Sequence, residues 1–433
     1  METFDDGWVA RHVAQTMKIW NACAWNKGTA PVKIEATLYT PAEQSRREQA
    51  YDEALESVEN DLQAPLKNGH ERHARQNRIV QSFARFSARA LGLQGDATAL
   101  LTNEFMPVGT SLARCARRFD PSLPMSDVIQ AARNAWTACG MQPLLGVPVT
   151  LTPSIFGYSL LYPYSDNLLD DETISASAKL NFSRRFRSRL SGEGLEPEDE
   201  REHAVWALIA LIEAQYARQD FPQVFDCLLA IHRAQENSLD QLHPSGSAPP
   251  SASLRLSCAK GGTSVLADAC LVRGSLDKAE SRFAFEWGVL LQLGDDLQDV
   301  KDDLRRGSLT LFSRQAAAGE PLDALAIQLL NFSEKVGTRM DRLPHGTPAL
   351  KNLLKMSWRS LIIRAVADSH QFFSAHFLNH AEKCSPFRFG FLRERSERLA
   401  SREGLYTALF EALLEPSEEQ IAVPVDASAL AAL

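Results

Sequence analysis

The sequence predicts an all-α protein, and two observations support that prediction. Apolar residues recur at helical spacing through most of the 433 residues, whereas the strict alternation typical of strands is scarce. Connections rich in Gly, Ser and Pro, such as residues 243–253 and 343–348, separate the helical stretches. Helices that follow one another through short connections predict helix packed on helix in a bundle.

Taken in order, the first clear helical pattern covers residues 49–64 and the second covers 71–92, which Gly92 ends. Further helical stretches are expected at residues 98–118, 125–139, 153–190, 198–217, 221–242, 252–273, 277–306, 321–340, 348–383 and 389–414. We therefore expect an N-terminal helical extension at residues 1–70, one helical domain at 71–415 and a flexible tail at 416–433.

Composition and charge exclude several classes of protein. Apolar residues make up 45% of the chain and charged residues 23%, which is ordinary for a globular protein and excludes a largely disordered one. No apolar run approaches the roughly 18 residues of a membrane span. The net charge of -8 argues against general nucleic-acid binding. The acidic start lacks the features of a signal peptide, and seven cysteines without a CxxC pair fit free thiols in the cytoplasm.

The strongest functional signal is an acidic run that follows an apolar stretch. Asp295, Asp299 and Asp303 stand four residues apart, which places them near one face of a helix. Like charges at this spacing destabilise a helix by roughly 0.2–0.5 kcal/mol per pair, so three of them call for a compensating cation. Magnesium prefers carboxylate oxygens and commonly shares them with substrate phosphates. The pattern therefore predicts a Mg²⁺ site.

A second acidic run, with Asp166, Asp170 and Asp171, also follows an apolar and aromatic stretch. Either run alone fits a solvated helix face. Two helices of this polarity, packed side by side, would instead form an apolar pocket with carboxylates at its rim. Such a pocket suits an oily molecule with a diphosphate head, because cations neutralise the leaving group and the pocket excludes water.

Five further residues are candidates for substrate binding. Tyr158, Tyr162 and Trp287 precede the acidic runs by four or eight residues, towards the same helix faces. Their rings would either pack in the core or form a cavity wall whose π faces stabilise a carbocation. Arg255 and Lys260, upstream of the second run, are candidates for holding the diphosphate.

These motifs resemble those of the class I isoprenoid (terpene and prenyl) synthase superfamily. The segment 288–299, which reads GxxxQLxDDxxD, is similar to the second Asp-rich motif of trans-prenyl diphosphate synthases. The spacing of Asp295, Asp299 and Asp303 also matches the metal-binding triad of terpene cyclases. The first run resembles the DxxxD motif of squalene and phytoene synthases and that of bacterial tetraprenyl-β-curcumene synthases. Residues 260–263 (KGGT) resemble the lysine-containing helix break that contacts diphosphate in prenyl synthases.

The resemblance implies a single α-helical bundle of the class I isoprenoid synthase type with a central apolar cavity. It implies several Mg²⁺ ions, a prenyl diphosphate substrate and a diphosphate-releasing lyase or transferase. The aspartates expected to act in catalysis are Asp166, Asp170, Asp295 and Asp299, and Asp171 and Asp303 complete the expected metal ligands.

Departures from the family's patterns argue against chain elongation and favour cyclisation or head-to-head coupling. Chain-elongating synthases carry a Gly-Gly-Lys-Arg type segment and an Arg pair soon after the first motif. That segment is missing from the sequence, and the nearest pair, Arg184 and Arg185, lies well beyond Asp171. Head-to-head coupling, chain elongation and a non-catalytic helical binding protein remain alternatives. The basic residues at 184–189 fit a solvated face, phosphate contact or peripheral contact with an anionic membrane. Prenyl chain length and oligomeric state, including a homodimer, stay open.

Overall fold

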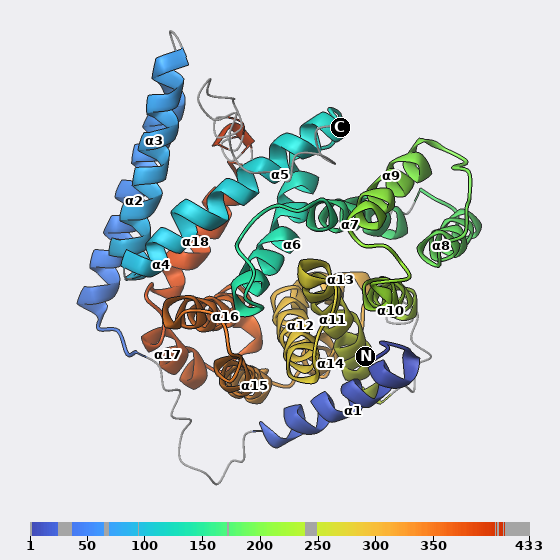
Figure 1. Ribbon diagram of the computed structural model, residues 1–433. Coiled ribbons are helices and arrows are strands. Elements are labelled where there is room, and N and C mark those ends of the chain that lie inside the picture. Colours follow the sequence, from blue (N-terminus) through green and yellow to red (C-terminus); the bar gives the residue numbers. More distant parts are fainter. Residues whose placement is uncertain are drawn as a thin grey trace.

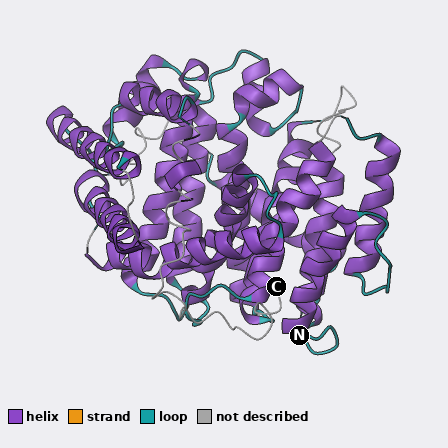
Figure 2. Ribbon diagram, turned by 90° about the horizontal axis from the view of Figure 1, so that it is seen from above, coloured by secondary structure: helices purple, strands orange, loops and turns teal. Residues whose placement is uncertain are grey.

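The computed structural model describes residues 2–24, 37–64, 69–93, 95–170, 173–238 and 249–402, with a few further positions up to residue 411. Every regular element in this part of the chain is a helix, and no strand occurs in it (Figure 2). The prediction of an all-α protein is therefore confirmed.

The helices of the first half of the chain are α1 (Asp6–Ala22), α2 (Pro41–Gln63), α3 (Gly69–Phe86), α4 (Gly95–Ala99), α5 (Met106–Phe119), α6 (Met125–Leu144), α7 (Pro153–Asp170), α8 (Ala176–Leu190) and α9 (Glu200–Gln215). Those of the second half are α10 (Pro222–Ser238), α11 (Pro250–Arg273), α12 (Lys278–Gln298), α13 (Val300–Arg306), α14 (Leu311–Ala317), α15 (Asp323–Asp341), α16 (Pro348–Asp368), α17 (Ala375–Lys383) and α18 (Phe389–Ala400). Residues 153–190, 277–306 and 348–383, each expected as one helical stretch, are divided between α7 and α8, α12 and α13, and α16 and α17.

Helices α11 and α12 lie at the centre of the molecule as antiparallel neighbours (Figure 1). They approach closely because glycines face each other. A Cβ on Gly261 would lie 2.4 Å from the Cβ of Gln292, and one on Gly288 would lie 2.0 Å from the carbonyl oxygen of Gly261. Helix α11 runs unbroken through residues 260–263, so the expected helix break is wrong. The glycine there permits tight helix packing.

The first helix belongs to the same core. Asp5 caps α1 by accepting a hydrogen bond from the backbone N–H of Trp8. Phe4 and Trp8 are buried, and the Trp8 ring packs edge-on against Phe285 of α12 with ring centroids 5.7 Å apart. Helix α1 also contacts α11. The segment expected as an N-terminal extension therefore contributes side chains to the central hydrophobic cluster. The tail expected at 416–433 lies outside the described residues.

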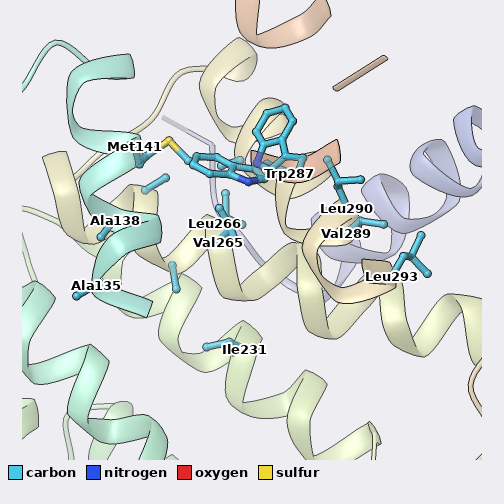
Figure 3. Close-up of a cluster of buried hydrophobic side chains, with 14 of the residues drawn as sticks. Ala135, Ala138, Met141, Ile231, Val265, Leu266, Trp287, Val289, Leu290 and Leu293 are labelled. Atoms are coloured by element: carbon cyan, nitrogen blue, oxygen red, sulfur yellow. The ribbon is translucent and has the colours of Figure 1, made fainter. Parts of the chain in front are cut away.

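The hydrophobic core is filled where α6, α12 and α16 meet. Trp287 is 2% exposed, and its ring lies against Trp358 of α16 and Phe283, with centroids 5.5 and 5.6 Å away. A Cβ on Gly140 of α6 would lie only 3.2 Å from the indole. Figure 3 shows Met141 beside the same ring. At this level, side chains occupy the space in which a central cavity was expected.

Two further findings concern the chain as a whole. Among the described residues, no helix combines the length and the apolar character needed to cross a bilayer. The seven cysteines are free thiols, as the odd count without a CxxC pair predicts.

Candidate functional site

The carboxylates of α12 and α13 lie along one nearly continuous helix face. The backbone N–H of Asp299 donates to the carbonyl of Asp295, and that of Asp303 donates to the carbonyl of Asp299, each at 2.8 Å. Helical hydrogen bonding therefore continues past the C-cap of α12 at Asp299. Asp295 and Asp299 are exposed and Asp303 is half-buried. The three residues occupy the register that their spacing predicts.

Asp295 lies among other carboxylates. Burial and the charges of Asp296 and Asp299 raise its pKa from 3.8 to about 7, against the lowering effect of the charges of Lys260 and Arg133. The Asp295 side chain nevertheless has an exposed surface. Water that reaches the carboxylate screens its charge and reduces the energy of its repulsion by the neighbouring acids.

The neighbouring Asp296 points the other way and joins two helices. It is 5% exposed and accepts hydrogen bonds from Ser257 Oγ of α11 at 2.6 Å and from Gln292 Nε2 at 2.9 Å. Burial and the charge of Asp296 raise the pKa of Asp303 to about 6, and a hydrogen bond from Thr310 opposes this shift. Asp296 thus anchors α12 to α11 beside the exposed acids.

Two basic side chains face these acids. Lys260 of α11 is half-buried and Arg133 of α6 is exposed, and both act on Asp295 through their charge. Arg255 is exposed on α11, five residues before Lys260 and so roughly 8 Å away along the axis. Arg133 was not among the five candidates for substrate binding, and the structure places it beside the acidic face.

The first acidic run can be placed only in part. The backbones of Asp166 and Asp170 belong to the last turns of α7, but their side chains, and Asp171 as a whole, lie outside the described residues. Just before them, the Tyr164 hydroxyl donates to Asp120 at 2.7 Å.

Helix α6 connects the ends of α7 and α12. Asn167 of α7 donates to Asp127 of α6 at 3.1 Å. Arg133, which acts on Asp295, lies six residues further along α6, or roughly 9 Å along its axis. The two acidic runs therefore flank the same end of α6.

A small apolar cavity of about 30 Å³ adjoins this end of the bundle, between α7, α8 and α10. Its walls include Tyr158, Tyr162, Phe186, Leu190, Ile231 and His232. The Tyr158 hydroxyl donates to the Ser264 carbonyl of α11 at 3.4 Å, one turn, or roughly 6 Å, from Lys260. The structure thus brings Tyr158 and Tyr162 together, whereas Trp287 is not among the lining residues and packs in the filled core.

The basic residues after the first acidic run are largely neutralised. Arg185 pairs with Glu202 at 2.7 Å, and Arg189 pairs with Glu213 at 2.5 Å. These ion pairs favour the solvated face over phosphate contact for this segment. A surface hollow of about 520 Å³ between α2 and α18 is also lined by paired charges, including Asp52 and Arg395.

The sequence reasoning missed a buried acid at the junction of α6 and α11. Asp268 is 2% exposed, and its Oδ1 accepts a hydrogen bond from Asn134 Nδ2 at 3.2 Å, while no partner reaches Oδ2 from the described residues. Burial raises the pKa of Asp268 well above its ordinary value. A lone acid within the apolar run 265–272 was the available signal.

Among the side chains that the structure describes, no three His, Cys, Asp or Glu residues are gathered closely enough to hold a metal ion. The acids of α7 are not part of that set. Comparison of the chain with protein-family models, with curated proteins and with solved structures finds no match in any of the three.

Proposed function

We propose that the protein is a class I terpene synthase, which ionises an allylic prenyl diphosphate with the help of Mg²⁺ and cyclises the carbocation. The observation that carries this proposal is the acidic face of Asp295, Asp299 and Asp303, whose pKa values are all raised. Carboxylates that repel one another and can be reached by solvent suit a hard divalent cation. The adjoining cavity supplies an apolar compartment.

Carboxylate oxygens, the donors on this face, are the ligands that Mg²⁺ prefers in proteins. Asp295, Asp299 and Asp303 would hold it from one side, and Asp166 and Asp170 of α7 from the other. When bound, Mg²⁺ supplies positive charge that neutralises the diphosphate leaving group.

The chain's own cations complete the polar half of the site. Lys260 and Arg133 face the acids, so they would donate charge-assisted hydrogen bonds to the diphosphate oxygens and orient them. As the C–O bond breaks, both of its electrons leave with the diphosphate. Positive groups that are already in place stabilise this developing charge without reorganisation.

The hydrocarbon would occupy the cavity beneath. Tyr158, Tyr162 and Phe186 present aromatic rings there, which stabilise a carbocation by the cation–π effect. The present volume of about 30 Å³ is far below the roughly 300 Å³ or more of a small-molecule site. Entry of a prenyl chain therefore requires side chains between α7, α8 and α10 to move apart.

The test is a reaction with one substrate. Purified protein is incubated with Mg²⁺ and allylic diphosphates of ten to twenty-five carbons, without isopentenyl diphosphate, and the release of diphosphate and the products are analysed by gas chromatography. We expect diphosphate and a cyclic apolar product, and we expect EDTA to stop the reaction. Asp299→Asn should be inactive. The matched control Asp302→Asn, whose side chain is exposed and pairs with Arg305 at 2.7 Å, should be active.

The other outcomes identify the alternatives. A requirement for isopentenyl diphosphate with a longer linear diphosphate as product would show chain elongation. A doubled carbon skeleton would show head-to-head coupling. Unchanged substrate in the presence of Mg²⁺ would favour a binding protein and contradict the proposal.

A further inference from the structure

A histidine that the sequence reasoning did not single out lies in the wall of the apolar cavity. His232 of α10 is 5% exposed, and its ring packs edge-on against Phe186 of α8 with centroids 5.0 Å apart. Both residues line the cavity together with Tyr158 and Tyr162 of α7. An imidazole ring in a wall made mostly of apolar and aromatic side chains calls for an explanation.

Hydrogen bonding fixes which ring nitrogen carries the proton. Nε2 of His232 lies 3.1 Å from the carbonyl oxygen of Ser183, and a carbonyl can only accept, so Nε2 is the donor. In the neutral ring, Nδ1 then carries the lone pair. Among the hydrogen bonds of the described residues, those of His232 are made through Nε2, so the lone pair on Nδ1 remains able to accept a proton.

The surroundings keep this ring neutral. Burial lowers the pKa of His232, Arg187 and Arg233 lower it further, and Glu236 raises it. The net direction is downward from an ordinary value of 6.5, so the free imidazole is a base at neutral pH.

We propose that His232 is the base that ends the carbocation reaction, an inference that rests on the proposed function. A C–H bond next to the cationic carbon breaks, and its electron pair becomes the π bond of an alkene. The proton passes to Nδ1 and forms an imidazolium ion, which returns the proton to water after the product leaves. The product is therefore a hydrocarbon and not an alcohol.

The structure also supplies a counter-charge for the imidazolium ion. Glu236 Oε1 lies 3.6 Å from Nε2 of His232 and accepts a hydrogen bond from Ser183 Oγ at 2.5 Å. Glu236 also pairs with Arg187 at the surface. Ser183 and Arg187 hold the carboxylate in place, so its charge stabilises the protonated ring as it forms.

The experiment separates ionisation from proton removal. His232→Gln keeps an N–H donor for the Ser183 carbonyl but removes the base, and His203→Gln on the exposed surface of α9 is the matched control. Diphosphate release and the ratio of alkene to alcohol are measured for both variants. For His232→Gln we expect diphosphate release within about twofold of wild type and an alkene-to-alcohol ratio at least about tenfold lower. His203→Gln should leave both unchanged.

Three results would overturn the inference, and they distinguish a wrong base from a wrong proposed function. Normal diphosphate release with an unchanged product ratio in His232→Gln would exclude His232 as the base while leaving the proposed function intact. No diphosphate release by the wild type would overturn the proposed function itself. If His232→Gln does not fold, ¹⁵N NMR of histidine-labelled wild type decides: we expect a neutral ring protonated on Nε2 at pH 7, and a ring protonated on Nδ1 would exclude the proton transfer.

Discussion

Replacing Asp295 with asparagine should stabilise the folded protein at alkaline pH while abolishing turnover. The pKa of Asp295 is raised from 3.8 to about 7 in the folded state, so the folded chain holds a proton that the unfolded chain has already lost. Stability of the wild type therefore falls as the pH rises from about 4 to above 7. Below about pH 4 the carboxyl is protonated in both the folded and the unfolded state, so Asp295 does not lower the stability. Above pH 7 the carboxylate is ionised in both states, and the loss of stability is complete.

The stability gained by Asp295→Asn follows from the same two pKa values. The difference between 3.8 and about 7 corresponds to about 4 kcal/mol for a fully desolvated carboxylate. The Asp295 side chain is exposed, and screening by water reduces this to about 1 kcal/mol. Unfolding entropy of about 2.1 cal/mol/K per residue amounts to ~0.9 kcal/mol/K for 433 residues, so Tm should rise by about 1 °C at pH 8.

The assay is urea and thermal unfolding of wild type, Asp295→Asn and Asp302→Asn at pH 5 and pH 8. Asp302 is exposed, so removing its charge relieves its repulsion of Asp299 but also loses its ion pair with Arg305 at 2.7 Å, and the two effects oppose each other. A lower Tm for Asp295→Asn at pH 8, or the same shift in both variants, would refute the argument from repulsion. Full turnover by Asp295→Asn would refute its role as a metal ligand.

Three other outcomes are expected. Trp287→Ala should lower the free energy of unfolding by about 3–5 kcal/mol in urea titrations without changing the product ratio, because Trp287 is packed in the core, and a shifted product ratio would place it at the substrate. Mg²⁺ should raise Tm more at pH 8 than at pH 5, since protons compete for Asp295 and Asp303, and equal shifts at both values would contradict metal binding there. Gly261→Ala should cost at least about 1–3 kcal/mol because its Cβ would meet that of Gln292 at 2.4 Å, and unchanged urea midpoints would show that α11 and α12 can separate freely.

The spacing of apolar residues predicted the helices well, because a helix that buries one face needs apolar residues at helical spacing. It did not reveal the break after α7 or the one at residues 369–374 within 348–383, because apolar spacing continues across both. Residues 260–263 show the converse case. The resemblance to prenyl synthases implied a break there, whereas the apolar periodicity predicted one helical stretch at 252–273, and the two glycines allow close approach to α12 within a continuous helix.

The site was predictable where it depends on one helix and not where it depends on several. The register of Asp295, Asp299 and Asp303 follows from helix geometry alone. Trp287, eight residues before Asp295, lies about 80° around the helix from it, and that offset is enough to turn the indole into the filled core. His232 could not be found from its own neighbours, since the cavity exists only where α10 meets α7 and α8.

The packing of α1 has a consequence for synthesis of the chain on the ribosome. Trp8 and Phe4 are buried only once α11 and α12 have formed, and Phe285, which covers Trp8, is translated about 280 residues later. At about 5–20 residues per second this delay lasts about 14–56 s, during which two large aromatic side chains stay uncovered. The nascent chain therefore presents an aggregation-prone segment early, and chaperones that bind apolar nascent segments should increase the yield of folded protein. A variant with polar residues at both positions would depend less on chaperones, but it would lose the contact that joins α1 to the core.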